Sequence, residues 1–355
     1  MTTNPLDADR PPEPSRAERR AERAAGGRRR DDAMMVPDVA FDSYYGRSVV
    51  KPSPWEADIP AYIFLGGLAA GSALVGAGGA ARGLPALRRN GRYAALAAVA
   101  VGGVALVRDL GKPSRALNMM RTVKLTSPMS LGSWILTGFG TFAGLAATAE
   151  AGRGLLAEGS RLARVLRAVE PAANAGSVVF APPLAAYTAV LLADTATPTW
   201  HESHRELPFV FVGSASAAAA GLALVTAPSS QTGPARRMAV AGAAIELAAM
   251  ERLERTLGET LSEPLKAGRA GRLLKASRVL TMAGAATAAV LGGNRAAAAL
   301  SGLALMAGSA CTRFGIFEAG QESAKDPRYT VEPQRARLEQ RRAHGVVDDS
   351  ITTGR

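Results

Sequence analysis

Residues 59–81 read IPAYIFLGGLAAGSALVGAGGAA and contain no charged side chain. A run of about 18 or more apolar residues is long enough to cross the hydrocarbon core of a bilayer as a helix. Most residues in this run are glycine, alanine or serine, and such small residues let helix backbones approach closely in lipid. The stretch therefore predicts a transmembrane helix that packs tightly against its neighbours.

Seven further apolar runs follow, each bounded by charged residues or by proline and glycine. They are residues 93–107, 131–149, 176–193, 208–227, 238–250, 279–293 and 296–317. The second, sixth and seventh of the eight runs are short, so charged residues that flank them must lie at the membrane interface. The pattern predicts an all-α integral membrane protein with eight transmembrane helices.

The rest of the chain is polar. Residues 1–58 form an Arg-rich arm that we expect to be disordered in part, residues 59–317 hold the eight expected helices, and residues 318–355 form a polar tail. The formal net charge is +12, but the basic residues lie in tails and short connections without the interleaved aromatic residues of a nucleic-acid binder. The charge therefore favours contact with anionic membrane lipid over contact with nucleic acid.

The even number of helices places both termini on one side of the membrane. More Lys and Arg residues flank that side than the opposite side. Because basic loops favour the cytoplasmic side, we expect a multi-pass protein of the cytoplasmic membrane with cytoplasmic termini.

Haem, an iron–sulfur cluster and a bound metal ion are excluded by residue types. The chain has one cysteine, Cys311, and its three histidines, His201, His204 and His344, lie outside every apolar run. Two histidines three residues apart are too few for a zinc site, which needs a third protein ligand. Any redox electrons must therefore arrive from another subunit.

Unusual polar and aromatic side chains gather on the side of the membrane that holds the termini. All three tryptophans, Trp55, Trp134 and Trp200, belong to that side, although interfacial anchors are expected on both faces. The other members of the group are Glu56, Tyr62, Asp109, Tyr187, Asp194, His201 and Arg205. The asymmetry indicates that this face carries the function.

Three residues of this face have two readings each. Tyr62 and Glu56 either contact a ligand, through a phenol that donates a hydrogen bond and an acid that exchanges protons, or anchor the helix at the interface. Asp109 ends a helix, where a carboxylate is unfavourable unless it is paired. It either pairs with a basic neighbour, Arg108, Lys112 or Arg115, or carries protons.

Glu246 lies inside the sixth apolar run, and an acid at that depth is a functional candidate. Met250 and Glu254 follow at intervals of four residues, so the three side chains share one helical face. This face predicts a proton path, unless a neighbouring helix or protonation simply neutralises the acid. In the first run, Gly67 and Gly71 have the spacing of a helix-packing seam.

Several motifs occur together after residue 42. They are SYYGR (43–47), residues 56–71, DLGKP (109–113) with LNM (117–119), TSPMSLGSW (126–134), residues 187–194 with WHE (200–202), and DPRYTV (326–331). In combination they resemble the NrfD/PsrC family of membrane subunits from polysulfide-reductase-like molybdoenzymes and related quinone-linked complexes. The resemblance covers nearly all of the chain after residue 42.

This resemblance implies eight helices in two four-helix bundles, with a quinone site among the first four helices. It also implies a docked ferredoxin-like iron–sulfur subunit and a molybdopterin catalytic subunit that exchange electrons with the quinone. We expect menaquinone as the quinone, and Tyr62, Asp109 and Glu56 as the residues that act on it. The expected quinone-binding residues are Tyr62, Gly66, Gly67, Trp134, Tyr187 and Asp194.

The same reading assigns partner docking to Lys112, Arg115, His201 and Arg205, and a proton path to Glu246 and Asp109. The expected function is that of a quinone-reactive membrane anchor. Two alternatives stay open, namely a secondary transporter and a purely structural anchor. A transporter would need broken helices at a midplane site, and Pro182 with Pro183 could form one such break.

Overall fold

The computed structural model describes residues 48–110, 112–157 and 159–344, without the side chains of Arg115 and Leu117. Most of the predicted arm, the motif at residues 43–47 and the last residues of the predicted tail therefore lie outside the described part. Within that part every regular element is a helix.

Eight helices are long. They are α2 (Asp58–Ala81), α3 (Pro85–Asp109), α4 (Pro128–Leu155), α5 (Arg161–Ala193), α7 (Leu207–Thr226), α8 (Gly233–Lys266), α9 (Gly268–Leu291) and α10 (Arg295–Lys325). The shorter helices are η1 (Pro113–Met120), α6 (Pro198–Glu202), η2 (Ser229–Gln231) and the polar α11 (Arg328–Ala343). Each predicted apolar run coincides with a different long helix.

Five of the long helices, α2, α3, α5, α7 and α10, are long and apolar enough to cross a membrane. Most of the long helices extend beyond the predicted runs: α5 begins at Arg161 instead of residue 176, and α10 continues to Lys325 instead of residue 317. The reason is that Ala, Leu, Arg and Glu in the flanks favour helix. Hydropathy marks only the part of a helix that suits lipid.

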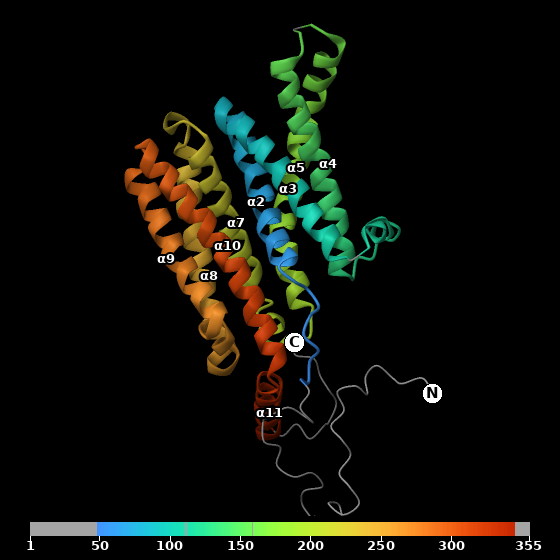
Figure 1. Ribbon diagram of the computed structural model, residues 1–355, viewed down its shortest axis with the longest axis vertical. Helices are drawn as coiled ribbons and strands as arrows, with labels where there is room; N and C mark the ends of the chain where they lie inside the picture. Colours follow the sequence, from blue (N-terminus) through green and yellow to red (C-terminus); the bar gives the residue numbers. More distant parts are fainter. Residues whose placement is uncertain (1–47, 111, 158, 345–355) are drawn as a thin grey trace, which may run out of the picture.

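The long helices pack in two groups. In the first group α2 packs against α3 and α5, and α4 packs against both of those helices. In the second group α7 packs against α8 and α10, and α9 packs against the same two. Contacts between α2 and α7 join the groups, and Figure 1 shows the helices running side by side along the long axis.

Small residues allow the close approach of α2 to α7. A Cβ atom at Gly71 would lie 2.5 Å from the Cβ of Ala219 and 2.8 Å from the carbonyl oxygen of Ala215. A Cβ atom at Gly67 would lie 3.1 Å from the Cβ of Ala215. Both glycines therefore lie in a helix-packing seam, where a larger residue would push α2 away.

The chain alternates in direction through the long helices. The starts of α2, α4 and α7 lie at the same end as the ends of α3 and α5 and the short helices α6 and α11 (Figure 1). We call this the terminal end. Helix α5 continues without interruption through Pro182 and Pro183, so it does not contain the break that a transporter reading would need.

Helix α8 is interrupted near the terminal end. Gly258 has φ +69° and ψ −171°, a left-handed backbone conformation that glycine adopts without steric cost. The segment after it, residues 259–266, runs in a new direction before α9 begins. Leu265 and Lys266 of this segment line a cavity.

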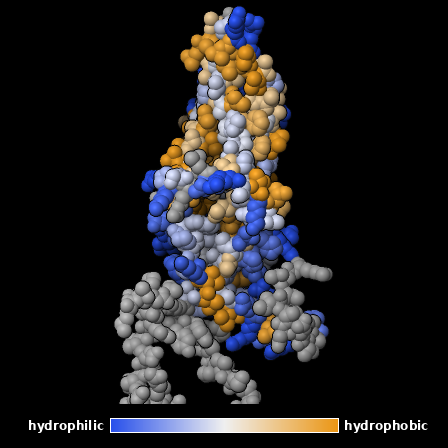
Figure 2. Space-filling view, turned by 90° about the vertical axis from the view of Figure 1, so that its right-hand side faces the viewer, coloured by the Kyte–Doolittle hydropathy of each residue, from blue (hydrophilic) through white to orange (hydrophobic). Residues whose placement is uncertain are grey.

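The surface of α4 and α5 fits contact with lipid. Exposed large apolar side chains on these helices include Leu145, Val165, Val179 and Val190. Figure 2 shows hydrophobic residues over much of the upper part of this side of the molecule, whereas hydrophilic residues gather lower down.

Candidate functional site

Trp200 fixes the terminal end of the helices around the start of α2. Its ring is fully buried, its Nε1 donates a hydrogen bond to the carbonyl oxygen of Ile316 at 2.8 Å, and it stacks on Trp55 with the ring centroids 6.2 Å apart. Gln321 of α10 donates hydrogen bonds to the backbone oxygens of Ser53 and Trp55 at 3.0 and 3.2 Å. These contacts hold the segment that enters α2.

Tyr62 lies one helical turn inside α2 and is only 2% exposed. Its hydroxyl oxygen is buried and has no hydrogen-bond partner among the described residues. Its ring lies against α3, since a Cβ atom at Gly102 would be 3.4 Å from Tyr62 Cδ2. A buried hydroxyl without a partner costs free energy, so a group supplied by a ligand would satisfy it.

Tyr187 of α5 packs against the same hydrophobic core as Tyr62. Its ring occupies the space where a Cβ atom at Gly132 of α4 would stand, and Leu136, one turn further along α4, packs against that core too. Tyr62, Tyr187 and Leu136 thus come from three helices of the first group. The core that they share also contains Trp200 and Phe211.

Gly66 and Gly67 have different surroundings. Gly66 follows Tyr62 by four residues and shares its helical face, and no atom lies within 4 Å of the position where its Cβ would be. A Cβ atom at Gly67 would contact Ala215 and lie 3.2 Å from Nη2 of Arg313. Gly67 therefore faces the second helix group, and only Gly66 faces the Tyr62 side.

Three acids, Glu56, Asp58 and Asp109, lie nearer the terminal end than Tyr62 does. The carboxylate of Asp109 accepts a hydrogen bond from the backbone of Glu56, and Asp58 is close enough to repel it. Asp58 lies one turn before Tyr62, about 6 Å along the helix axis at 1.5 Å per residue. The cluster therefore lies nearer the terminal end of α2 than Tyr62 does.

Of the two interpretations of Asp109, the ion pair with Arg108 or Lys112 is not formed in the described part of the chain. Arg108 points to Asp58, with 3.9 Å between Nε and the carboxylate oxygen, and Asp109 forms no ion pair within the described residues. The end of α3 lies beside the segment that enters α2, and the donor to Asp109 is the backbone of Glu56 in that segment. Sequence neighbours such as Lys112 are carried away by the turn into η1.

The remaining predicted residues lie outside the Tyr62 environment. Trp134 is 38% exposed, and its Nε1 donates to the carbonyl oxygen of Thr122 at 3.3 Å, which fastens the connection before α4. Asp194 is exposed just beyond the end of α5. His201 Nδ1 lies 3.0 Å from the carbonyl oxygen of Ala193. Lys112 and Arg205 are exposed, and the side chain of Arg115 lies outside the described part.

Glu246 lies deep in the second helix group and is 3% exposed. The Thr312 hydroxyl donates a hydrogen bond to its Oε1 at 2.5 Å, and Ser277 Oγ lies 2.5 Å from the Thr312 hydroxyl. A cavity of about 230 Å³ reaches from these three residues past Met250 to Glu254 at the terminal end. The face predicted from the sequence thus lines a cavity.

Arg313 was missed by our sequence reading, although an arginine inside the last apolar run is a signal in itself. It is 1% exposed, and its guanidinium lies 3.8 Å from the centroid of the Phe211 ring. Nη2 donates to the Phe211 carbonyl oxygen at 2.6 Å, whereas Nε and Nη1 have no partner among the described residues. The side chain occupies the boundary between the two helix groups.

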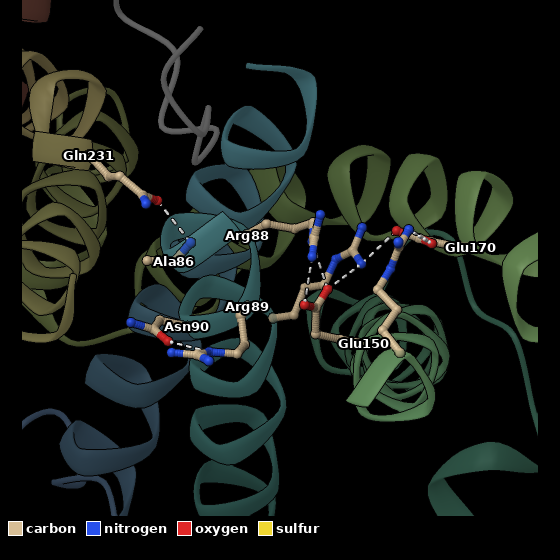
Figure 3. Close-up of polar contacts among 9 residues, drawn as sticks. Ala86, Arg88, Arg89, Asn90, Glu150, Glu170 and Gln231 are labelled. Atoms are coloured by element: carbon tan, nitrogen blue, oxygen red, sulfur yellow. Dashed lines mark hydrogen bonds and ion pairs between the residues drawn. The ribbon is translucent and has the colours of Figure 1, made fainter. Parts of the chain in front are cut away.

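A buried ion network at the opposite end was also missed. Glu150 of α4 accepts hydrogen bonds from Arg88 and Arg92 of α3 at 2.8 and 2.9 Å, and Arg92 also binds Glu170 of α5 at 2.8 Å (Figure 3). Arg153 completes the network on Glu170. Because the pairs join three helices, they clamp the first group at the end remote from Tyr62.

The described residues contain no group of three or more His, Cys, Asp and Glu side chains placed to hold a metal ion. The expectation that the whole chain carries no haem or cluster stays a prediction.

Comparison with protein families settles the relationship of the chain. The family model of polysulphide reductase, NrfD, matches residues 48–250, more than half of the sequence. The chain belongs to the NrfD family. This family comprises membrane subunits of molybdoenzyme complexes, in agreement with the apolar helices of the structure. No curated protein matches the chain significantly.

The matched residues cover the whole first helix group, α7 and the first half of α8. Tyr62, the acid cluster, Tyr187 and Glu246 therefore all lie in the part that the NrfD family shares. Arg313 and the far wall of the Glu246 cavity lie beyond it.

Proposed function

We propose that the chain is the quinone-reactive membrane anchor of a molybdopterin and iron–sulfur oxidoreductase, with menaquinone as its quinone. Membership of the NrfD family supports a membrane subunit of such a complex. The observation that carries the assignment to quinone is the buried hydroxyl of Tyr62, which has no partner among the described residues. The acid cluster lies before Tyr62 in the sequence and at the end of α3.

A quinone needs two electrons and two protons to become a quinol. The docked iron–sulfur subunit supplies the electrons one at a time, because this chain has no redox centre of its own in our reading. Tyr62 donates a hydrogen bond to a quinone carbonyl oxygen, and Gly66 leaves room beside it. Asp109 and Glu56 pass protons from solvent at the terminal end, since carboxylates placed near the reacting oxygen act as general acids and bases.

We further propose that all eight long helices cross the membrane, with both termini in the cytoplasm. Helices α4, α8 and α9 are not among the five clear candidates, but α4 packs against α5, α8 against α7 and α9 against α10, which are. The iron–sulfur subunit then docks at the terminal end, on the surface that includes Lys112, Arg115, His201 and Arg205.

The cavity between Glu246 and Glu254 supports a second part of the proposal, a proton path through α8, α9 and α10. Its volume of about 230 Å³ is large enough to hold several waters. Water in the cavity would link Glu254 at the terminal end to the carboxylate of Glu246. Helix α5 gives no support to a transporter, because it is continuous at Pro182 and Pro183.

Replacing Tyr62 with Phe tests the quinone site against a purely structural role. The ring and its packing stay, and only the hydroxyl is lost, so an anchor without chemistry would keep its turnover. We expect the assembled complex to lose quinone turnover about tenfold or more, given the size of general acid–base effects. The measurement is steady-state menaquinone reduction by the purified complex.

Asp109→Asn should lower turnover in the same assay, because the amide keeps the shape and cannot exchange a proton. Trp134→Phe is the control, since its indole binds Thr122 away from Tyr62. Normal turnover in both Tyr62→Phe and Asp109→Asn, in complexes that assemble, would place the quinone elsewhere.

Charge reversal tests the docking surface. The double change Lys112→Glu with Arg205→Glu should reduce co-purification of the iron–sulfur subunit several-fold, because it places like charges against an acidic partner surface. The matched control is Arg161→Glu with Arg164→Glu at the start of α5, at the end of the molecule opposite to the docking surface. If both double variants reduce co-purification equally, the basic residues affect only the orientation of the helices in the membrane and not the docking of the partner.

The proton path is tested by Glu246→Gln. We expect quinone turnover to continue while proton movement across proteoliposomes, followed with a pH-sensitive dye, is lost. Glu251→Gln is the control, since Glu251 is exposed on α8 and does not line the cavity. Unchanged proton movement in Glu246→Gln would rule out this route.

A further inference from the structure

The mouth of the Glu246 cavity is built differently from its floor. The floor is formed by Glu246, Ser277 and Thr312, and the middle by apolar side chains, Leu247, Met250, Leu265 and Leu274. Around the mouth stand Lys266, Lys275, Arg278 and Glu254. Lys266 comes from the segment after the Gly258 interruption, which brings it across from α9.

The mouth carries an excess of positive charge. Glu254 is the one acid there, and it pairs with Arg278 at 2.8 Å and with Lys266 at 4.0 Å. Glu251 lies outside the lining and reaches Arg278 only at 3.9 Å, while it binds Arg255 at 2.9 Å. Lys275 is exposed, and no ion pair is formed by it within the described residues. A ligand with negative charge would therefore find an available ammonium group beside two partly compensated cations.

The same side of α9 continues as an apolar stripe toward the middle of the bilayer. Val279 follows Lys275 by four residues, and Met282 follows Val279 by three, so they share one helical face. Val279 is 66% exposed and Met282 is 55% exposed, and Ile245 on the neighbouring α8 is exposed too. Cations at the interface and apolar side chains directly below them match a lipid, with its phosphate at the surface and its acyl chains in the core.

We propose that this place is a binding site for an anionic phospholipid. Lys275, Lys266 and Arg278 hold the phosphate of the headgroup at the cavity mouth, and the acyl chains lie along Val279 and Met282. A free phosphate would use the cations alone and leave the apolar stripe uncovered. The site rests on the proposed crossing of the membrane by α8 and α9, but not on the quinone reaction, because these two helices of the second group form it.

The test is lipid binding to the purified full-length protein in detergent, measured by native mass spectrometry. Phosphatidylglycerol is titrated against the wild type and two variants, and phosphatidylcholine serves as the lipid without net negative charge. Lys275→Gln removes the cation at the mouth. Arg272→Gln removes an equal charge from an exposed position one turn earlier on α9 that does not line the cavity.

We expect the wild type to bind phosphatidylglycerol more tightly than phosphatidylcholine. Lys275→Gln should weaken phosphatidylglycerol binding about fivefold, the usual effect of one basic residue near an anionic lipid surface. Arg272→Gln should have a much smaller effect, and Lys275→Arg should bind as the wild type does. Millimolar inorganic phosphate should not displace the lipid.

Three results would overturn the proposal. They are equal binding of the two lipids, equal loss in Lys275→Gln and Arg272→Gln, and displacement of the lipid by inorganic phosphate. The last result would show that the mouth recognises phosphate without the apolar stripe. Circular dichroism of each variant verifies that the helices are intact, so a folding defect is distinguished from a binding defect.

Discussion

A polar group inside a bilayer has to find its partner within the protein, since lipid offers none. Most of the buried polar groups of this structure obey that constraint. Arg92 of α3 pairs with Glu150 of α4 and with Glu170 of α5. Glu246 accepts a hydrogen bond from Thr312. Several buried atoms nevertheless have no hydrogen-bond partner among the described residues, among them the Tyr62 hydroxyl, two nitrogens of Arg313, Arg92 Nε and Glu246 Oε2. Such groups are expensive in a membrane and are found where function requires them.

Tyr62 and Arg313 lie on either side of one helix. Tyr62 faces α3, whereas Arg313 lies behind α2, against Gly67 at the boundary with α7 and α10. Arg313 also follows Thr312, which binds Glu246. In our account the quinone pocket and the proton cavity are thus separated by a single arginine. In the proposed function, the first helix group carries the redox chemistry and the second the proton movement.

The sequence predicted the helices, because hydropathy depends on local composition alone. It also predicted which unusual side chains lie at the terminal end, because successive helices run in alternating directions. It also placed Glu246, Met250 and Glu254 on one face, since helical periodicity fixes that relation. It could not tell which neighbour each residue would meet. Basic residues close in the sequence were one possible partner of Asp109, yet its carboxylate accepts a hydrogen bond from the backbone of Glu56, in the segment before α2.

The same limit explains Gly67 and the ion network. A glycine pair four residues apart indicates close packing, but only the structure shows that α7 and Arg313 fill that face. The charges at Arg88, Arg92, Glu150 and Glu170 belong to three different helices. Their pairing depends on how those helices pack, which no single stretch of sequence encodes.

The central claim is that quinone binds among the first four long helices, next to Tyr62. The most direct measurement is photolabelling of the purified complex with an azido-quinone, followed by peptide mapping of this chain. The account predicts label on α2 near Tyr62 and Gly66 and on α5 near Tyr187, and competition by unlabelled menaquinone. Label confined to α8 and α9, or label that menaquinone does not displace, would contradict it.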